Sequence, residues 1–297
     1  KMKKAWTEKF MQGVFFIAAC ASVLAVALIC VFLFANGIPA MKEIGFLDFL
    51  TGERWRPNNK IFGILPMIAG SIYVTAGAII VGVPIGILTS VFMAKYCPKR
   101  AYLVLKGATE LLAGIPSVVY GFFGLVVLVP ITREFCRHLK ALGILRTAGD
   151  GNSILTASLL LGMMILPTII GVTESAIRAV PEQYYEGALA LGATHERSIF
   201  KVVLPAAKSG VVAGIVVGIG RAIGETMAVI MVAGNQPRMP QGIAKGVRTL
   251  TANIVMEMGY ATDLHREALI ATAVVLFVFI LIINLSVSLL KRRSSHE

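Results

Sequence analysis

The sequence predicts an all-α membrane protein with six transmembrane helices. Two observations concern composition: 57% of the 297 residues are hydrophobic and only 15% are charged, whereas water-soluble domains carry about a quarter charged residues. The third observation is a pattern, because the charges gather in short clusters between long apolar runs. Such alternation is typical of a bundle of helices that cross the membrane.

The first predicted span is Val14–Ala35, a run without a charged residue. At about 1.5 Å per residue, a run of this length crosses the ~30 Å hydrocarbon layer. Basic residues Lys1, Lys3 and Lys4 precede it, as they would in a signal peptide. The apolar part of a signal peptide is shorter, however, at roughly 7–15 residues. We therefore expect this segment to be a retained span.

Five further spans follow from the same criterion. They are predicted within Ile64–Ala94, within Leu111–Thr132, at Ser153–Thr173, at about Ser209–Gly234 and at Ala268–Leu290. The expected organisation is a tail, first span and outer loop in residues 1–62, a membrane core in 63–290 and a cytoplasmic tail in 291–297. The outer loops 36–60, 133–152 and 235–265 are too short to hide a soluble domain.

Lysine and arginine set the expected orientation, because they are enriched in cytoplasmic loops. With a cytoplasmic N-terminus, somewhat more of them fall on inner than on outer segments, and Lys291, Arg292 and Arg293 close the last span. An even number of spans then places both termini in the cytoplasm. The outer segments still carry more bases than acids. Such a basic mouth would attract anions, although ordinary loop charge is an equal alternative.

Several classes of function are excluded by missing motifs. The sequence has no Gly-Lys dipeptide and therefore no P-loop, and it has no H-E-x-x-H or paired Cys-x-x-Cys motif. Cys20, Cys30, Cys97 and Cys136 lack metal-ligand spacing. The basic pI of about 9.7 reflects charge that flanks the membrane rather than nucleic-acid binding. We expect neither a metal nor a cofactor in this chain.

The loop Val180–Pro205, between the fourth and fifth spans, predicts two short helices at the cytoplasmic surface. The first is Glu182–Leu191, ended by Gly192 as a C′ glycine. Thr194 is a suitable N-cap for the second, which Pro205 ends where the fifth span starts. An amphipathic helix lying on lipid headgroups is one interpretation. A surface that fits a groove on a cytosolic partner is the other.

The residues of this loop carry a resemblance. Glu186-Gly187-Ala188, three residues, Gly192, nine residues and then Val202-x-Leu204-Pro205 resembles the E-A-A–x3–G–x9–I-x-L-P loop of binding-protein-dependent ABC importer permeases. Gly187 and Val202 depart from that pattern, in place of Ala and Ile. The resemblance implies a type I ABC importer permease fold over about residues 65–290. It also implies that coupling helices dock onto an ATPase subunit through Glu186, Gly187, Ala188, Gly192, Leu204 and Pro205.

Two charges, Arg221 and Glu225, lie four residues apart inside the fifth predicted span. On a continuous helix one face would carry Gly214, Gly218, Arg221, Glu225 and Ala228. Glycine faces pack closely against other helices, and a charge at the membrane centre costs at least ~2.5–3.5 kcal/mol. Both charges are therefore expected to point into the protein.

Three interpretations of this pair remain open. It forms a structural i,i+4 ion pair, it belongs to a proton relay or gate, or Arg221 binds an anion in a pathway while Glu225 holds it in place. A planar guanidinium suits an oxyanion because it donates two parallel hydrogen bonds. Further pathway candidates are Ser71, Thr75, Ser117 and Thr226. Hydroxyls in spans usually just bond to their own backbone or a neighbouring helix.

A second resemblance concerns the cargo. Gly220–Asn235, "GRAIGETMAVIMVAGN", looks like the fifth-span motif of C-type permeases of phosphate-specific ABC transporters, and Phe62–Gly86 and Ala113–Leu125 are similar to that family too. It implies transport of inorganic phosphate across the bacterial cytoplasmic (inner) membrane. The alternatives are another oxyanion, such as sulfate or molybdate, or an ion-coupled secondary transporter in which Glu225 carries a proton.

The same resemblance implies the partners. They are a homologous A-type permease subunit, two copies of a cytosolic ATPase that binds ATP and Mg, an extracytoplasmic phosphate-binding protein and membrane lipid. The chain is then not an enzyme on its own, since its partner supplies the energy. The coupling loop argues against the ion-coupled alternative.

Overall fold

The computed structural model describes the backbone of residues 2–145 and 147–294 and the side chains of 10–145 and 147–286. The basic side chains of Lys1, Lys3, Lys4 and Lys291–Arg293, on which the expected orientation partly rests, lie outside the described residues. The same holds for Arg146 and for residues 295–297 of the predicted tail.

Helices make up almost all of the regular structure. In chain order the elements are α1 (Met2–Ile44), α2 (Phe46–Thr51), β1 (Trp55–Arg56), η1 (Pro57–Asn59), β2 (Ile61–Phe62), α3 (Leu65–Val91), the π-helical turn η2 (Phe92–Tyr96), α4 (Lys99–Gly114), α5 (Ser117–Phe123), the π-helical η3 (Gly124–Leu128), α6 (Val129–Ala141), α7 (Ile154–Arg178), α8 (Glu182–Ala190), α9 (His195–Ser198), the π-helical η4 (Ile199–Val203), α10 (Leu204–Ala206), α11 (Lys208–Gly224), α12 (Met227–Val232), α13 (Leu250–Met258) and α14 (Asp263–Ser294). Strands β1 and β2 pair antiparallel.

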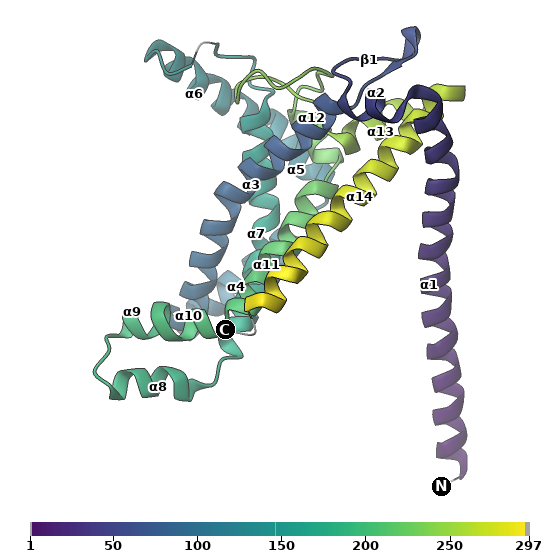
Figure 1. Cartoon of the computed structure of the whole chain (residues 1–297). Coiled ribbons are helices and arrows are strands. Elements are labelled where there is room, and N and C mark those ends of the chain that lie inside the picture. The colour runs from purple at the N-terminus through teal and green to yellow at the C-terminus, as the bar shows by residue number, and fades with distance from the viewer. Residues whose placement is uncertain (1, 146, 295–297) are drawn as a thin grey trace.

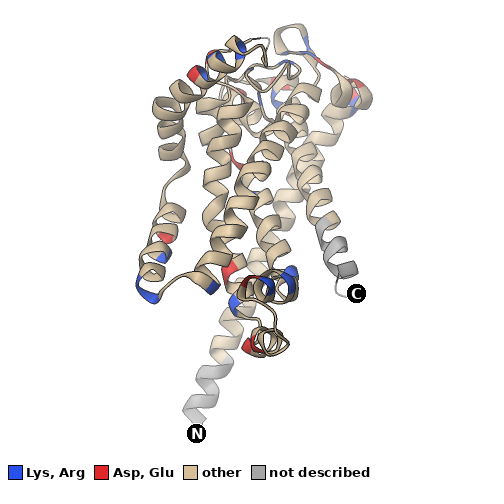
Figure 2. Ribbon diagram, turned by 90° about the vertical axis from the view of Figure 1, so that its left-hand side faces the viewer, with Lys and Arg blue, Asp and Glu red and all other residues tan. Residues whose placement is uncertain are grey.

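The membrane-spanning segments confirm the predicted class. Within the described residues, five helical segments are long and apolar enough to cross a membrane: Phe10–Ile44, Leu65–Tyr96, Ser117–Ala141, Ile154–Arg178 and Asp263–Ser286. One more candidate, which is the fifth span in chain order, consists of His195–Ala206 and Lys208–Gly224 and is bent by 70° between them. Charged residues lie mainly at the two ends of the molecule, and the band between them is nearly free of charge (Figure 2).

The third span begins later than predicted. Leu111 belongs to α4, a separate helix, and the span starts at Ser117 and continues to Ala141. The break follows from Pro116, because a proline disfavours helical backbone in the residue before it. Ile115 is accordingly extended, with φ −69° and ψ 126°.

The fifth span is not the continuous helix that was predicted. Helix α11 ends at Gly224, Glu225 is extended with φ −68° and ψ 132°, and α12 begins only at Met227. The bend before α11 lies between Ala206 and Lys208, just beyond Pro205. The single helical face that was to carry both charges therefore ends between them.

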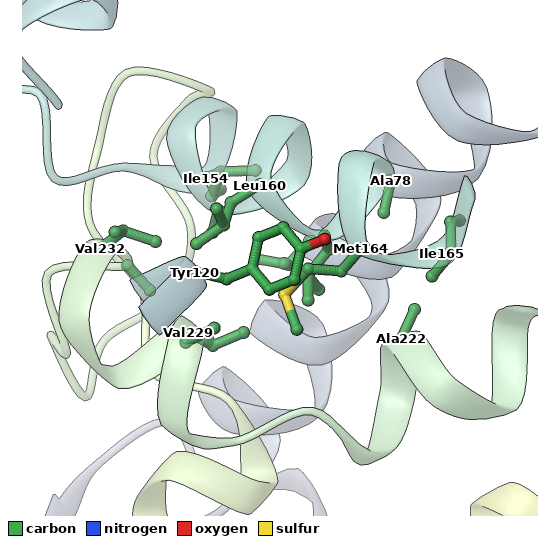
Figure 3. Close-up of a cluster of buried hydrophobic side chains, with 14 of the residues drawn as sticks. Ala78, Tyr120, Ile154, Leu160, Met164, Ile165, Ala222, Val229 and Val232 are labelled. Atoms are coloured by element: carbon green, nitrogen blue, oxygen red, sulfur yellow. The ribbon is translucent and has the colours of Figure 1, made fainter. Parts of the chain in front are cut away.

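Helix α7 is the centre of the bundle, packed between α3 and α11. The predicted glycine face of α11 makes this approach close, because a Cβ at Gly218 would lie 2.9 Å from Ile169 Cγ1 and one at Gly214 2.9 Å from Thr173 Oγ1. A buried apolar cluster then joins α3, α5, α7, α11 and α12. Figure 3 shows Tyr120 in the middle of it, among Leu160, Met164 and Val229.

Helix α1 stands apart from the bundle along most of its length and meets it near its C-terminal end (Figure 1). There Gly37 lies close to Val274 and Ala271 of α14. At that end the buried carboxylate of Glu257 accepts hydrogen bonds from Trp55 Nε1 and His265 Nε2, both 2.8 Å away, and also pairs with Arg248. It thereby ties the hairpin, α13 and α14 together.

Candidate functional site

The first part of the site is Arg221, in the last turn of α11. Its Nη1 donates to Thr168 Oγ1 of α7 at 3.2 Å, and the residue is half-buried. Within the described residues Arg221 makes no ion pair. A guanidinium carries five N–H donors, so most of them are unused here. A Cβ on Gly220 or Gly224 would meet nothing within 4 Å, so the turn that carries Arg221 borders open space.

Glu225 caps helix α12 and makes no ion pair with Arg221 among the described residues. Its Oε1 accepts the backbone N–H groups of Thr226 at 3.1 Å and Ala228 at 3.3 Å, which satisfies free donors at the start of α12. A carboxylate is also favoured there by the helix dipole. The interpretation of Arg221 and Glu225 as a structural i,i+4 ion pair is wrong for this structure.

The break between α4 and α5 lies beside the break between α11 and α12. Helices α5 and α12 pack through Gly121, where a Cβ would come within 3.0 Å of Ala228 Cα. Ser117, the first residue of α5, is about one turn from Gly121, and Met227, the first residue of α12, directly precedes Ala228. The break after α4 and the break after α11 therefore meet in the same part of the bundle.

The remaining predicted pathway residues lie in two places, the break before α12 and the buried face of α3. Thr226 lies in the break, with its Oγ1 donating to the Gly224 carbonyl at 3.2 Å. Ser71 is buried and accepts the N–H of Leu250 at 3.0 Å, and Thr75 is buried one turn further along α3. The start of α13 connects Ser71 to the break, because Thr251 Oγ1 donates to the Glu225 carbonyl at 3.1 Å.

The coupling loop has the two helices that the sequence predicted. Gly192 has φ +84°, and the N–H groups of Gly192 and Ala193 bond to the carbonyls of Leu189 and Ala188, which is a Schellman ending. Thr194 Oγ1 accepts the N–H of Arg197 at 3.3 Å and caps α9. Glu186, Gly187, Gly192 and Pro205 are exposed, and Ala188 and Leu204 are half-buried.

The loop is fastened to η2, the π-helical turn that follows α3, by a group of side chains that we call the loop clamp: Lys95, Tyr96, Glu182, Tyr185 and His195. Lys95 Nζ pairs with Glu182 Oε2 at 3.2 Å and lies 5.4 Å from the centre of the Tyr185 ring. The Tyr185 hydroxyl is 2.6 Å from His195 Nδ1, and the Tyr96 ring contacts His195 edge-on with centroids 4.8 Å apart.

Sequence reasoning missed the carboxylate of Glu174, near the end of α7. It is 1% exposed and accepts from Lys106 Nζ at 2.9 Å, Tyr102 OH at 2.8 Å and Arg178 Nε at 2.6 Å. These hydrogen bonds raise the pKa of Tyr102 and of Lys106, against burial in the case of Lys106. Glu174 thereby fastens α4 to α7. Thr168 was missed as well, since it lies in an apolar run with no signal beyond its hydroxyl and Pro167.

Comparison with known families matches residues 82–296 to the binding-protein-dependent transport system inner membrane component. This chain belongs to that family. The permease is 36% identical over 286 residues to the probable ABC transporter permease protein YqgH of Bacillus subtilis, covering 92% of this chain and 89% of that one. It is 33% identical over 289 residues to the phosphate transport system permease protein PstC of Mesorhizobium japonicum, covering 94% and 88%.

Solved structures agree on the fold of the permease. A bacterial ABC transporter involved in the import of the acidic polysaccharide alginate superimposes with a TM-score of 0.58 at 16% identity, covering 96% of this chain and 99% of that one. The MetNI methionine ABC transporter gives 0.54 at 20% identity, covering 78% and 94%. The type I importer permease fold implied by the coupling loop is confirmed.

Proposed function

We propose that this permease moves inorganic phosphate across the bacterial cytoplasmic membrane, and that Arg221 binds the ion on its way. The carrying observation is the guanidinium of Arg221, which is half-buried beside a helix break, held by one hydroxyl and free of any described carboxylate partner. An arginine in this condition keeps donors for an oxyanion. The relative named as a phosphate permease supports phosphate as the cargo.

Glu225 fits this proposal as a neighbour that limits binding. Its carboxylate stays on the start of α12, close in sequence to Arg221, and so adds a negative charge without consuming the guanidinium. A phosphate ion carries one to two negative charges, and a nearby carboxylate opposes its binding. We infer that this opposition helps the ion to leave.

Each partner in the proposal has a separate role in transport. A homologous A-type permease would complete the pathway on the open side of Arg221, and a phosphate-binding protein would deliver the ion at the outer end. Two ATPase copies would dock on α8–α10 and hydrolyse ATP with Mg. Both termini would be cytoplasmic, since the visible ends of α1 and α14 run towards the end of the molecule that carries α8–α10 (Figure 1).

The test is phosphate uptake in cells whose own permease gene has been replaced by Arg221→Gln or Arg221→Lys. We expect Gln to reduce the rate by roughly 10- to 100-fold, which corresponds to a hydrogen bond to a charged group of about 1.5–3 kcal/mol. Lys should recover part of the rate, because it keeps the charge but not the bidentate geometry. Assembly with the ATPase and its basal ATP turnover should stay normal.

The control is Arg137→Gln, because Arg137 is exposed and its one ion pair among the described residues is with the exposed Glu134. It should transport normally. Normal uptake by Arg221→Gln would exclude Arg221 as a pathway ligand. Competition by sulfate or molybdate tests the alternative oxyanions. Uptake of either ion at the rate of phosphate would contradict phosphate as the cargo. It would not contradict Arg221 as the ligand.

A further inference from the structure

A pocket of about 340 Å³ opens at the coupling-loop end of the bundle, away from the pathway. It is walled by the end of α3 with η2, by the start of α4 and by the end of α7. Its lining includes Met93, Lys95, Cys97, Lys99, Tyr102 and Arg178. None of them has a part in the transport site proposed above.

Three of the lining residues, Lys95, Lys99 and Arg178, are cations, and none is a carboxylate. Glu182 and Glu174 neutralise part of this charge from outside the lining, through Lys95 and Arg178. Lys99 is exposed and has no ion pair among the described residues. The local charge of the pocket is therefore positive.

The pocket is also a built structure rather than a group of surface lysines. Arg178 is fixed from three sides: its Nε bonds to Glu174 at 2.6 Å, its Nη2 bonds to the Met93 carbonyl at 3.0 Å, and its guanidinium lies 4.3 Å from the centre of the Tyr102 ring. The side chain of Lys95 is only 13% exposed. In addition, α4 starts at this pocket with no side-chain cap and no acidic residue in its first turn.

We propose that this pocket binds a phosphate group. A fixed arginine with two lysines beside it, around a small cavity, matches the charge and acceptor oxygens of a phosphate. Two sources offer that group at the cytoplasmic surface: the headgroup of an anionic lipid and free inorganic phosphate. Basic pockets between helices on the cytoplasmic side are suited to lipid headgroups, and free inorganic phosphate presents the same charge and acceptor oxygens.

Binding here would reach the coupling loop through Lys95. That side chain either pairs with Glu182 of α8, as it does in this structure, or turns to a phosphate in the pocket. The occupied pocket would therefore loosen the loop clamp at its only ion pair among the described residues. The inference concerns an accessory site and does not depend on the cargo proposed above.

Cys97 provides the reporter, because this residue lines the pocket and is partly exposed. The full-length permease with its partner subunits would be placed in nanodiscs of phosphatidylcholine, with or without phosphatidylglycerol, and treated with N-ethylmaleimide. Peptide-resolved mass spectrometry then gives the rate at Cys97. Inorganic phosphate is added in one arm, and gluconate at equal ionic strength in the other.

We expect at least threefold slower alkylation of Cys97 when the pocket is filled. Slowing by inorganic phosphate in both lipid mixtures would assign free phosphate, and slowing by phosphatidylglycerol alone would assign the lipid headgroup. Lys99→Gln should abolish the effect and Lys208→Gln, an exposed control at the start of α11, should keep it. Arg221→Gln should also keep it, which separates this site from the pathway.

An unchanged rate at Cys97 in every arm would overturn the proposal. So would equal protection of the wild type and Lys99→Gln, since the cation would then have no part in binding. Lys99→Arg, which keeps the charge, should restore protection, and its failure to do so would likewise contradict a phosphate site.

Discussion

Arg221 donates to Thr168 across the interface of α11 and α7, at 3.2 Å, and not to Glu225 four residues along the chain. The backbone explains the choice, because Glu225 has left the helix and its carboxylate caps α12. Thr168 therefore orients the guanidinium without neutralising it. Because we propose that Arg221 binds the transported ion, the Thr168 hydroxyl should matter for transport but little for folding.

Replacing Thr168 by Val should lower the maximal rate of phosphate uptake roughly 2- to 10-fold, in line with one hydrogen bond of about 0.5–1.5 kcal/mol. Thr168→Ser keeps the hydroxyl and should transport normally. The measurement is initial uptake with saturating binding protein. In combination with Arg221→Gln the Val change should add nothing, and a full additive loss would contradict the positioning role.

Glu225 can be tested as a cap. Glu225→Ala removes the acceptor for the N–H groups of Thr226 and Ala228, so the free energy of unfolding should fall by about 0.5–2 kcal/mol. Glu225→Gln keeps an oxygen in the same place and loses only the favourable charge, so it should lose less stability than Glu225→Ala, about 0.3–1 kcal/mol. Thermal unfolding of the purified complex measures both. Equal stability of the two variants would show that the cap contributes nothing.

The sequence was sufficient for features that depend on local chemistry. The caps at Gly192 and Thr194 follow from residues within one turn of each other, and both are present. The break at Pro116 had a local signal as well, which the run of apolar residues from Leu111 concealed. Length and apolarity define a span, but they do not say where a helix inside it is interrupted.

The break at Glu225 had no such signal. It is held by Thr251, which donates to the Glu225 carbonyl across 26 residues, and a contact of that range is invisible to helical periodicity. The same is true of Glu174, whose partners Tyr102 and Lys106 lie on another helix. Hydrogen bonds between distant residues thus determine both the break at Glu225 and the attachment of α4 to α7. Neither feature could be predicted from sequence patterns.

Glu174 should be essential for the attachment of α4. Glu174→Gln leaves Lys106 and Arg178 without their shared carboxylate. Both cations are partly exposed, so the loss should be about 2 kcal/mol rather than the 3–5 kcal/mol of a fully buried pair. Amide hydrogen exchange should rise in α4 first. Glu110→Gln, an exposed change on the same helix, is the control, and equal exchange in both variants would refute the attachment.

Two glycines of the coupling loop should change stability in opposite directions when replaced by alanine. Gly192 has φ +84°, so Gly192→Ala forces a side chain into the left-handed region at about 1–2 kcal/mol. Gly187 lies inside α8, where an added Cβ would meet nothing within 4 Å, so Gly187→Ala should stabilise that helix by up to about 1 kcal/mol. Thermal unfolding measures the stability of both variants, and co-purification measures their binding to the ATPase. Destabilisation by the Gly187 change would contradict the open surroundings of that position.

Two adjacent tyrosines should separate docking from transmission. Tyr184 is 53% exposed and has no hydrogen bond among the described side chains, whereas Tyr185 is half-buried in the loop clamp and its hydroxyl contacts His195. Exposed aromatic side chains often provide much of the affinity of an interface. We therefore predict that Tyr184 faces the ATPase, whereas Tyr185 holds the loop to η2 at the end of the second span.

Tyr184→Ser should weaken binding of the ATPase to the permease in nanodiscs by roughly tenfold, equivalent to about 1.4 kcal/mol. Tyr185→Phe keeps the ring and removes only the hydroxyl, so the ATPase should bind as before while less phosphate is moved per ATP hydrolysed. Surface plasmon resonance and paired transport and ATPase assays distinguish the two losses. If Tyr185→Phe weakened docking as much as Tyr184→Ser, the clamp would be part of the interface and not the link behind it.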